Sequence, residues 1–203
     1  MDIVDAQIHI GPGGIAEALA AMEALGIRAA VIDEYWFRGA ANEPLHPLAG
    51  GGYRIVAPTA ELAAQLHPDR FSYLLRVFRD DPEYASIIRQ MRDAPGCRAL
   101  RIDPGLRSDF LKSFAEGGYD HILGAAADAG LPLFAFAPDN PAAFARAARA
   151  FPALRIVVDH CGVFSNSMRT SFAGLPPLGE AEQMALFDEV LALGELPNVA
   201  LKW

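Results

Sequence analysis

The 203-residue chain has little cysteine: Cys97 and Cys161 are its only two, and neither belongs to a Cys-x-x-Cys pair. This scarcity argues against a disulfide scaffold and against a structural zinc module built on thiolates. No apolar run approaches the roughly 18 residues that a membrane-spanning helix needs, and no basic start precedes a hydrophobic segment. We therefore expect a cytoplasmic protein with no membrane partner.

Positive charge is also in short supply. The chain has 17 Lys and Arg against 25 Asp and Glu, which gives a formal net charge of −8, and it has no basic run. We therefore expect no nucleic-acid partner, because such partners require a positively charged footprint. The glycine-rich phosphate loops, the His-Glu-x-x-His motif and the Gly-x-Ser-x-Gly motif are all absent. Dinucleotide, phosphoryl-transfer and serine-hydrolase chemistry consequently rank low.

Apolar sequence is abundant, at 52% of residues, and it falls into short runs that alternate with helix-like stretches. The runs predict strands at Asp2–Ile10, Ala29–Glu34, Phe71–Phe78, Cys97–Asp103, Leu131–Ala137, Arg155–His160 and Asn198–Trp203. The intervening patterns predict helices at Ile15–Leu25, Pro58–Leu66, Pro82–Arg92, Tyr119–Ala129, Pro141–Phe151 and Glu180–Leu193. Strands that alternate with helices indicate βαβ units around a parallel sheet.

The chain contains no linker or shift in composition that would divide it, so we expect one domain over residues 1–203. Its length suits a short α/β barrel, although an open parallel sheet could also end on a strand. The sequence stops inside the seventh predicted strand. We therefore expect a barrel that is truncated at its C-terminus and lacks the last βα unit. Two long segments that follow strands, Tyr35–Val56 and Val163–Gly179, occupy positions where barrel enzymes carry active-site loops.

Polar residues alternate along the first predicted strand. A period of two places Asp5, Gln7 and His9 on one face. Three polar side chains are costly on a face that enters a dry core, whereas the open end of a barrel lumen tolerates them. The alternative is a strand whose polar face is simply solvated.

A second signal is the β-branched strand that ends in Asp159 and His160, which are followed by Cys161, Gly162 and a long loop. A histidine in that position can ligate a metal, transfer a proton or donate to an oxyanion. The alternative is a structural histidine. The presence of His9 on another strand end favours the functional interpretation.

Cationic side chains form the third group of candidates. Arg101, near the end of the fourth strand, could bind a substrate carboxylate in bidentate fashion. An ion pair with Asp103 is the alternative. Arg76 and Lys202 are weaker candidates for the same role.

These motifs resemble a known family. Five short segments carry the resemblance, in chain order: Asp5-Ala6-Gln7-Ile8-His9, His67-Pro68-Asp69-Arg70-Phe71, Cys97-Arg98-Ala99-Leu100-Arg101, Val158-Asp159-His160-Cys161-Gly162 and Leu196-Pro197-Asn198-Val199. Together they are similar to the amidohydrolase-related TIM-barrel family (the amidohydrolase 2 type). Within it they resemble the lactonase-like branch, typified by 2-pyrone-4,6-dicarboxylate lactonase and fuconolactonase.

The resemblance implies a (β/α)8 barrel that hydrolyses a lactone or ester, within a superfamily of metal-dependent hydrolases. The family pattern on the first strand is Asp-x-His-x-His, and here Gln7 replaces the first His. Leu133–Ala137, on the fifth strand, offers no ligand. His9 and His160 remain as ligands for a divalent metal such as zinc, fewer than the three protein ligands of a typical catalytic site. We therefore expect no required cofactor.

The mechanism implied for an intact site uses His9 and His160 to polarise the carbonyl and stabilise the oxyanion. Arg101, with Gln7, Arg76 or Lys202, would bind a small anionic substrate. The family's water-activating Asp would lie beyond the chain's last residue, so we expect the 203-residue chain alone to have little activity. The alternatives are a metal-dependent decarboxylase of the same family and a degenerate barrel that has lost its chemistry. Homo-oligomerisation is left open.

Overall fold

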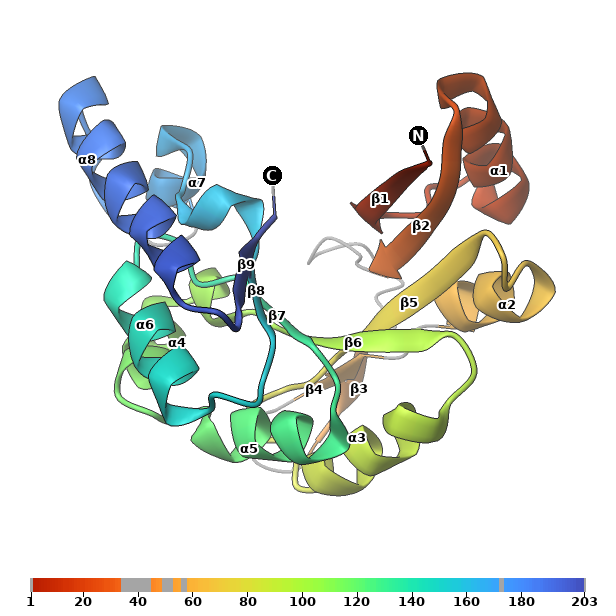
Figure 1. The fold of residues 1–203 in the computed structure, drawn as a ribbon, viewed down its shortest axis with the longest axis horizontal. Helices are drawn as coiled ribbons and strands as arrows, with labels where there is room; N and C mark the ends of the chain where they lie inside the picture. The colour runs from red at the N-terminus through yellow and green to blue at the C-terminus, as the bar shows by residue number, and fades with distance from the viewer. Residues whose placement is uncertain (1, 34–44, 49–52, 56–57, 172–173, 203) are drawn as a thin grey trace. The chain divides into compact units, whose positions relative to one another are not determined.

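The computed structural model describes residues 2–33, 45–48, 53–55, 58–171 and 174–202 (Figure 1). The chain divides into two compact units, Met1–Leu100 and Arg101–Trp203. The single domain expected from the sequence stays a prediction.

The first unit is built on parallel strands, with β1 beside β2 and β2 beside β5. Its elements are β1 (Ile3–Ile8), α1 (Gly14–Leu25), β2 (Ile27–Asp33), β3 (Leu45–Pro47), β4 (Tyr53–Ile55), α2 (Pro58–Leu66), β5 (Phe71–Arg76), α3 (Tyr84–Asp93) and the first part of β6 (Cys97–Ile102). The short strands β3 and β4 pair with each other in antiparallel fashion. They lie in the segment expected to be a loop, much of which falls outside the described residues.

Apolar side chains from the strands and helices form the core of the first unit. Ile32 of β2, Phe71 and Leu74 of β5 and Ile88 of α3 are each at most 2% exposed. Helix α1 ends at Gly26, whose φ of 69° is the left-handed conformation that glycine adopts without a Cβ penalty. This helix end is the one that the sequence predicted.

The second unit continues β6 and adds three more strands, with β7 parallel to β8 and β8 parallel to β9. Its elements after β6 are η1 (Pro104–Leu106), α4 (Ser108–Ala115), α5 (Asp120–Ala129), β7 (Leu133–Ala135), α6 (Pro141–Ala150), β8 (Ile156–Val158), η2 (His160–Gly162), α7 (Asn166–Ser171), α8 (Glu180–Leu191), η3 (Ala192–Glu195) and β9 (Val199–Leu201). Its core contains edge-to-face aromatic pairs, in which the ring of Phe114 lies 5.5 Å from that of Phe144 and 5.8 Å from that of Tyr119.

The strand order is β1-β2-β5-β6-β7-β8-β9, which follows the chain without a reversal. A doubly wound sheet would reverse its order at a switch point, whereas a barrel adds each strand beside the preceding one. The α/β fold of TIM-barrel type is therefore confirmed, with seven of a (β/α)8 barrel's eight strands in this sheet.

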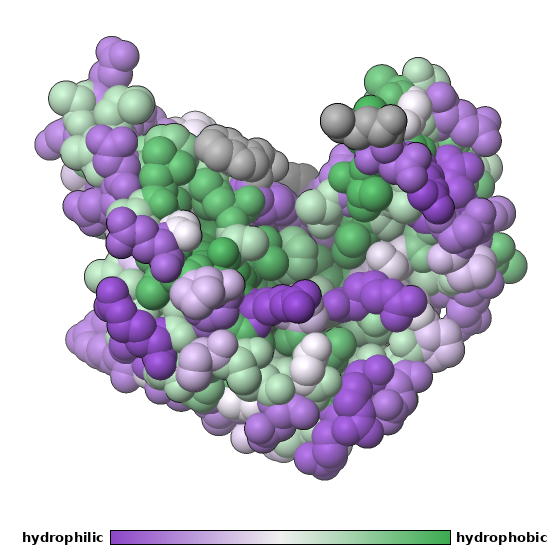
Figure 2. Space-filling view, in the orientation of Figure 1, coloured by the Kyte–Doolittle hydropathy of each residue, from purple (hydrophilic) through white to green (hydrophobic). Residues whose placement is uncertain are grey.

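Large apolar side chains reach the surface in both units, interspersed with hydrophilic residues on the face seen in Figure 2. The most exposed of these side chains are Ile3, Val4, Leu25, Leu62 and Leu66 in the first unit and Leu175, Met184 and Leu191 in the second. Within the described ranges, no helix has the length and apolar character needed to cross a bilayer.

Candidate active site

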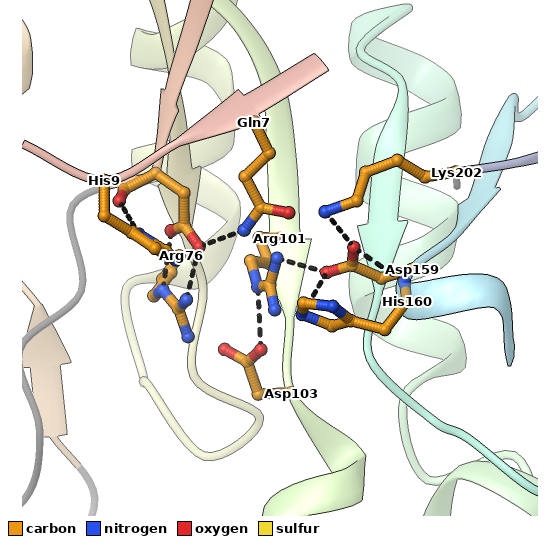
Figure 3. Close-up of polar contacts among 9 residues, drawn as sticks. Gln7, His9, Arg76, Arg101, Asp103, Asp159, His160 and Lys202 are labelled. Atoms are coloured by element: carbon orange, nitrogen blue, oxygen red, sulfur yellow. Dashed lines mark hydrogen bonds and ion pairs between the residues drawn. The ribbon is translucent and has the colours of Figure 1, made fainter. Parts of the chain in front are cut away.

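Polar side chains gather where the parallel strands end, in one cluster per unit (Figure 3). In the first unit, His9 follows the last residue of β1, Asp33 is the last residue of β2 and Arg76 is the last of β5. The carboxyl ends of the strands are where barrel enzymes carry their catalytic residues. This placement makes the first cluster a candidate site.

Asp33 organises the first cluster and is fully buried. Arg76 donates from Nε to Asp33 Oδ1 at 2.8 Å and from Nη2 to Oδ2 at 2.5 Å. Gln7 donates from its amide nitrogen to the same Oδ2 at 2.6 Å. A bidentate pair between a guanidinium and a carboxylate is short, directional and strong. The negative charge of Asp33 is thus neutralised by a fixed cation.

His9 is held through its ring. The Nδ1 nitrogen lies 2.6 Å from the main-chain carbonyl oxygen of Asp33. A carbonyl only accepts hydrogen bonds, so Nδ1 carries the hydrogen and a neutral ring bears its lone pair on Nε2. The contact therefore makes Nε2 the basic nitrogen of His9, able to accept a proton.

The backbone of β1 is irregular next to these side chains. The pairing register with β2 shifts between Asp5 and Ile8, and Asp5 Oδ1 accepts the backbone N–H of Gln7 at 3.0 Å. Local side-chain bonds of this kind compete with regular strand pairing. The polar alternation seen in the sequence thus serves to hold the strand end as well as to present Gln7 and His9.

The second cluster is centred on Asp159, which is also fully buried. Lys202 Nζ lies 2.5 Å from its Oδ1, and Arg101 Nη1 forms an ion pair with its Oδ2. Arg101 also donates from Nε to Asp103 Oδ1 at 2.8 Å. Arg101 therefore makes the ion pair with Asp103 that the sequence offered as the alternative to substrate binding, and a second one with Asp159.

Burial explains why these charges occur in pairs. The side chains of Arg101 and Lys202 are only 4% and 12% exposed. An isolated charge at such a depth would lose several kcal/mol of hydration free energy, which only close opposite charges and hydrogen bonds offset. The pairing makes Arg101 part of a rigid network at the end of its strand.

His160 stands beside Asp159 with its side chain 45% exposed and its Nε2 3.8 Å from Asp159 Oδ2. Its backbone N–H donates to Asp159 Oδ1 at 3.0 Å. The imidazole meets the ring of Phe136 edge to face, with 5.2 Å between the ring centres. The backbone is left-handed at both His160 (φ 50°) and Cys161 (φ 57°), which is uncommon away from glycine. Such strain is often found at functional sites.

Asp33 was not singled out from the sequence, although its signature was present. It is the last residue of β2, which contains Val31 and Ile32, and Asp159 likewise comes directly after the β-branched strand β8. The same rule that drew attention to Asp159 and His160 would have found it. No histidine follows Asp33, so it lacked the second signal that distinguished Asp159.

Comparison with known proteins places this fold in a family. A model of the amidohydrolase family matches residues 4–203. The chain therefore belongs to the amidohydrolase family, as its motifs indicated. No curated protein sequence matches the chain.

Solved structures of low sequence identity share the fold. A probable 2-pyrone-4,6-dicarboxylic acid hydrolase from Acinetobacter baumannii, with citric acid bound, is 12% identical with a TM-score of 0.56 over 99% of this chain and 83% of that chain. An amidohydrolase from Burkholderia multivorans with bound zinc is 12% identical with a TM-score of 0.67 over 99% of this chain and 69% of its own. A 5-carboxyvanillate decarboxylase from Novosphingobium aromaticivorans with bound manganese is 16% identical with a TM-score of 0.53 over 99% and 85%.

Two of these structures contain a divalent metal. Whether the present chain could bind such an ion depends on the arrangement of its own donor atoms. Among the described residues, no three His, Cys, Asp or Glu side chains form a group that could hold an ion. Asp33 is bound by Arg76, and Asp159 by Arg101 and Lys202. A divalent cation would have to compete with these fixed positive charges for the same oxygens. The residues of the described chain do not fit a divalent metal.

Proposed function

We propose that this protein is a hydrolase that opens a lactone or another ester of a small carboxylated substrate by means of activated water. The observation that carries the proposal is the hydrogen bond from His9 Nδ1 to the Asp33 carbonyl, which makes Nε2 the proton acceptor. Family membership supports hydrolysis, and so does the likeness to a probable pyrone-dicarboxylic acid hydrolase.

His9 takes the role of general base. The family resemblance implied that an Asp activates the water. The contact of His9 Nδ1 with the Asp33 carbonyl leaves Nε2 as the nitrogen that accepts the proton, so His9 can perform this step. The imidazole at this exposed strand end can take a proton from water as the water attacks the carbonyl carbon, and it can return that proton to the leaving alkoxide oxygen when the ester C–O bond breaks. The fixed ring orientation lowers the cost of aligning that proton transfer.

We assign to His160, in the second unit, the oxyanion-stabilising role that the family resemblance implies. Its exposed ring can donate a hydrogen bond, and the carboxylate of Asp159 lies beside it at 3.8 Å from Nε2. A pre-positioned donor stabilises the charge that develops in the transition state without first reorganising solvent. The anchored backbone of His160 supplies that positioning.

The substrate carboxylate is assigned to the cations at the strand ends. Lys202 is the best candidate, because its ammonium carries three N–H donors and is less deeply buried than the guanidinium of Arg101. Arg101 keeps Asp159 in place, while Arg76 and Gln7 keep Asp33 in place. The reaction proposed here uses no metal ion.

Product analysis tests the proposal. The purified protein is mixed with a panel of carboxylated lactones and esters and with their neutral analogues, and ring opening is followed by acid release and mass spectrometry. We expect hydrolysis of carboxylated substrates at the lowest KM. Release of CO2 without a hydrolysis product would instead identify a decarboxylase, the alternative that the manganese-containing decarboxylase of the same fold favours. Binding without turnover would identify a degenerate barrel.

A further inference from the structure

Asp139 has an unusual backbone and lies in the turn between β7 and α6 of the second unit. Its φ is 59°, in the left-handed region that Asp tolerates better than most residues because its short side chain can bond locally. Its side chain is only 10% exposed. A buried acid in a strained turn is retained only where the surrounding contacts hold it there.

Those contacts all reach the segment that follows β8. The carboxylate accepts the backbone N–H of Phe164 on Oδ1 at 3.0 Å and pairs with Arg169 through Oδ2. The backbone N–H of Asp139 donates to the carbonyl of Gly162 at 2.9 Å. One residue thus fixes three points of the chain just after His160.

Arg169 extends the connection from its own side. Its side chain is 13% exposed, and its Nε donates to the carbonyl of Pro176 at 2.7 Å. Its own carbonyl accepts the N–H of Leu175 at 3.1 Å. The guanidinium therefore ties the turn after α7 to Asp139.

Two aromatic ring contacts connect the segment that Asp139 holds to the ring of His160. Phe164, which is 3% exposed, meets Phe136 edge to face at 5.8 Å. Phe136 in turn meets the ring of His160 edge to face at 5.2 Å. Edge-to-face contacts are directional, so a shift of Phe164 changes the position that Phe136 offers to His160.

We propose that Asp139 and Arg169 are positioning residues that set the orientation of the His160 ring through Phe164 and Phe136. The inference rests on the proposed function only for the catalytic role of His160. The backbone N–H of Asp139 also bonds the carbonyl of Gly162, next to the left-handed residues His160 and Cys161, so the turn that carries the ion pair contacts this backbone directly. The pair thereby couples the loop after β7 to the reacting group on the loop after β8.

NMR of the histidine rings in the isotope-labelled protein tests this role without a substrate. His160→Asn assigns the His160 ring signals. Asp139→Asn keeps an oxygen for the Phe164 N–H but removes the charge facing Arg169, and Arg169→Met removes the guanidinium. In both variants we expect the His160 ring resonances to shift as the ring-current contribution of Phe136 changes. Arg169→Lys keeps the positive charge, so we expect it to restore part of the wild-type position.

The controls separate positioning from a general loss of order. Lys112→Met breaks an exposed ion pair with Glu116 in the same unit and should leave the His160 signals unchanged. The ring signals of His121 should stay in place in every variant. Wild-type His160 signals in folded Asp139→Asn and Arg169→Met proteins would overturn the proposal.

A further variant keeps the proposal testable if the ion-pair variants unfold. Phe164→Leu retains an apolar side chain and the ion pair but removes the ring that faces Phe136. We expect it to shift the His160 resonances as well, and unchanged signals would contradict the inference. Because the readout needs no substrate, a negative lactone assay would refute the proposed hydrolase and leave this inference standing.

Discussion

Asp33 holds three side chains of the first unit, two through its carboxylate and one through its carbonyl. The sequence predicted Gln7, His9 and Arg76 as separate candidates, and the structure joins them on one acid. These contacts span 24 to 43 positions along the chain. Such pairings depend on strand register, which residue alternation within a single strand does not contain.

The pair between Asp33 and Arg76 predicts a large effect on stability. Asp33→Asn leaves the charge of Arg76 buried without its opposite charge, so the free energy of unfolding should fall by about 3 kcal/mol. Urea denaturation measures this change. Asp93→Asn is the matched control, because its pair with Arg92 is exposed and its loss should have no measurable effect. An equal change in both variants would contradict the buried-pair account.

The role proposed for His160 predicts that its replacement lowers kcat. Replacing it with Asn removes the donor proposed for the oxyanion, and kcat should fall by about two orders of magnitude. Steady-state kinetics on the best carboxylated lactone measures the change. His121→Asn alters an exposed histidine on α5 and should keep wild-type kcat. If the His160 variant also kept wild-type kcat, its catalytic role would be refuted.

Two buried groups of the first unit predict sensitivity to alkali. Burial raises the pKa of the Cys97 thiol from 9.0 to about 11 and that of the Tyr73 phenol from 10.0 to about 12. Each folded-state pKa lies above its unfolded value, so the folded state retains the proton for longer. The resulting stability is complete below pH 9 and is lost as the pH rises, from 9 to about 11 for Cys97 and from 10 to about 12 for Tyr73.

The rise of the Cys97 pKa from 9.0 to about 11 corresponds to about 3 kcal/mol of stability. Unfolding free energies measured from pH 8 to 11 should fall steeply for the wild type and much less for Cys97→Ala. Tyr73→Phe should flatten only the portion above pH 10. Identical slopes in the wild type and both variants would show that these groups do not govern alkaline stability.

At the scale of helices and strands, the sequence predicted the alternating order well and the ends less well. The predicted strand Leu131–Ala137 is shorter in the structure, where β7 covers Leu133–Ala135. Phe136 and Ala137 are also buried, at 4% and 0% exposure. Burial rather than strand pairing keeps them apolar, so hydropathy alone overestimates the strand. The short helices α4 and α7 were missed because each offers only about two turns of pattern.

The side chain of Asn198 connects several elements of the second unit, so its replacement should lower stability. Its amide nitrogen lies 3.0 to 3.1 Å from the carbonyl oxygens of Ala148, Phe151 and Leu154, at the end of α6 and in the turn before β8. Asn198→Ala should lower the free energy of unfolding by about 2 kcal/mol, because these acceptors lose their donor. Asn198→Asp should cost more, since a carboxylate would face carbonyl oxygens.

Chemical denaturation of both variants measures these costs. Gln65→Ala, an exposed amide on α2, is the control and should change little. An Asp variant more stable than the Ala variant would contradict the donor role of Asn198.

At the scale of the whole molecule, the fold was the most predictable property. Strands that alternate with helices in unbroken order leave few arrangements, and the strand order and family match agree with the barrel type. The chemistry was less predictable, because the sequence shows cations and acids without showing which pairs form. Arg101 illustrates this, since its neighbour Asp103 was foreseen as a partner and the more distant Asp159 was not.

We propose that this amidohydrolase-family protein opens a carboxylated lactone with water activated by His9 and without a metal ion. The most direct test measures lactone turnover and bound-metal content on the same preparation, purified without a chelator. We predict turnover with far less than one ion per chain, unchanged by added zinc or manganese. A tightly held stoichiometric ion whose removal abolishes turnover would contradict the account.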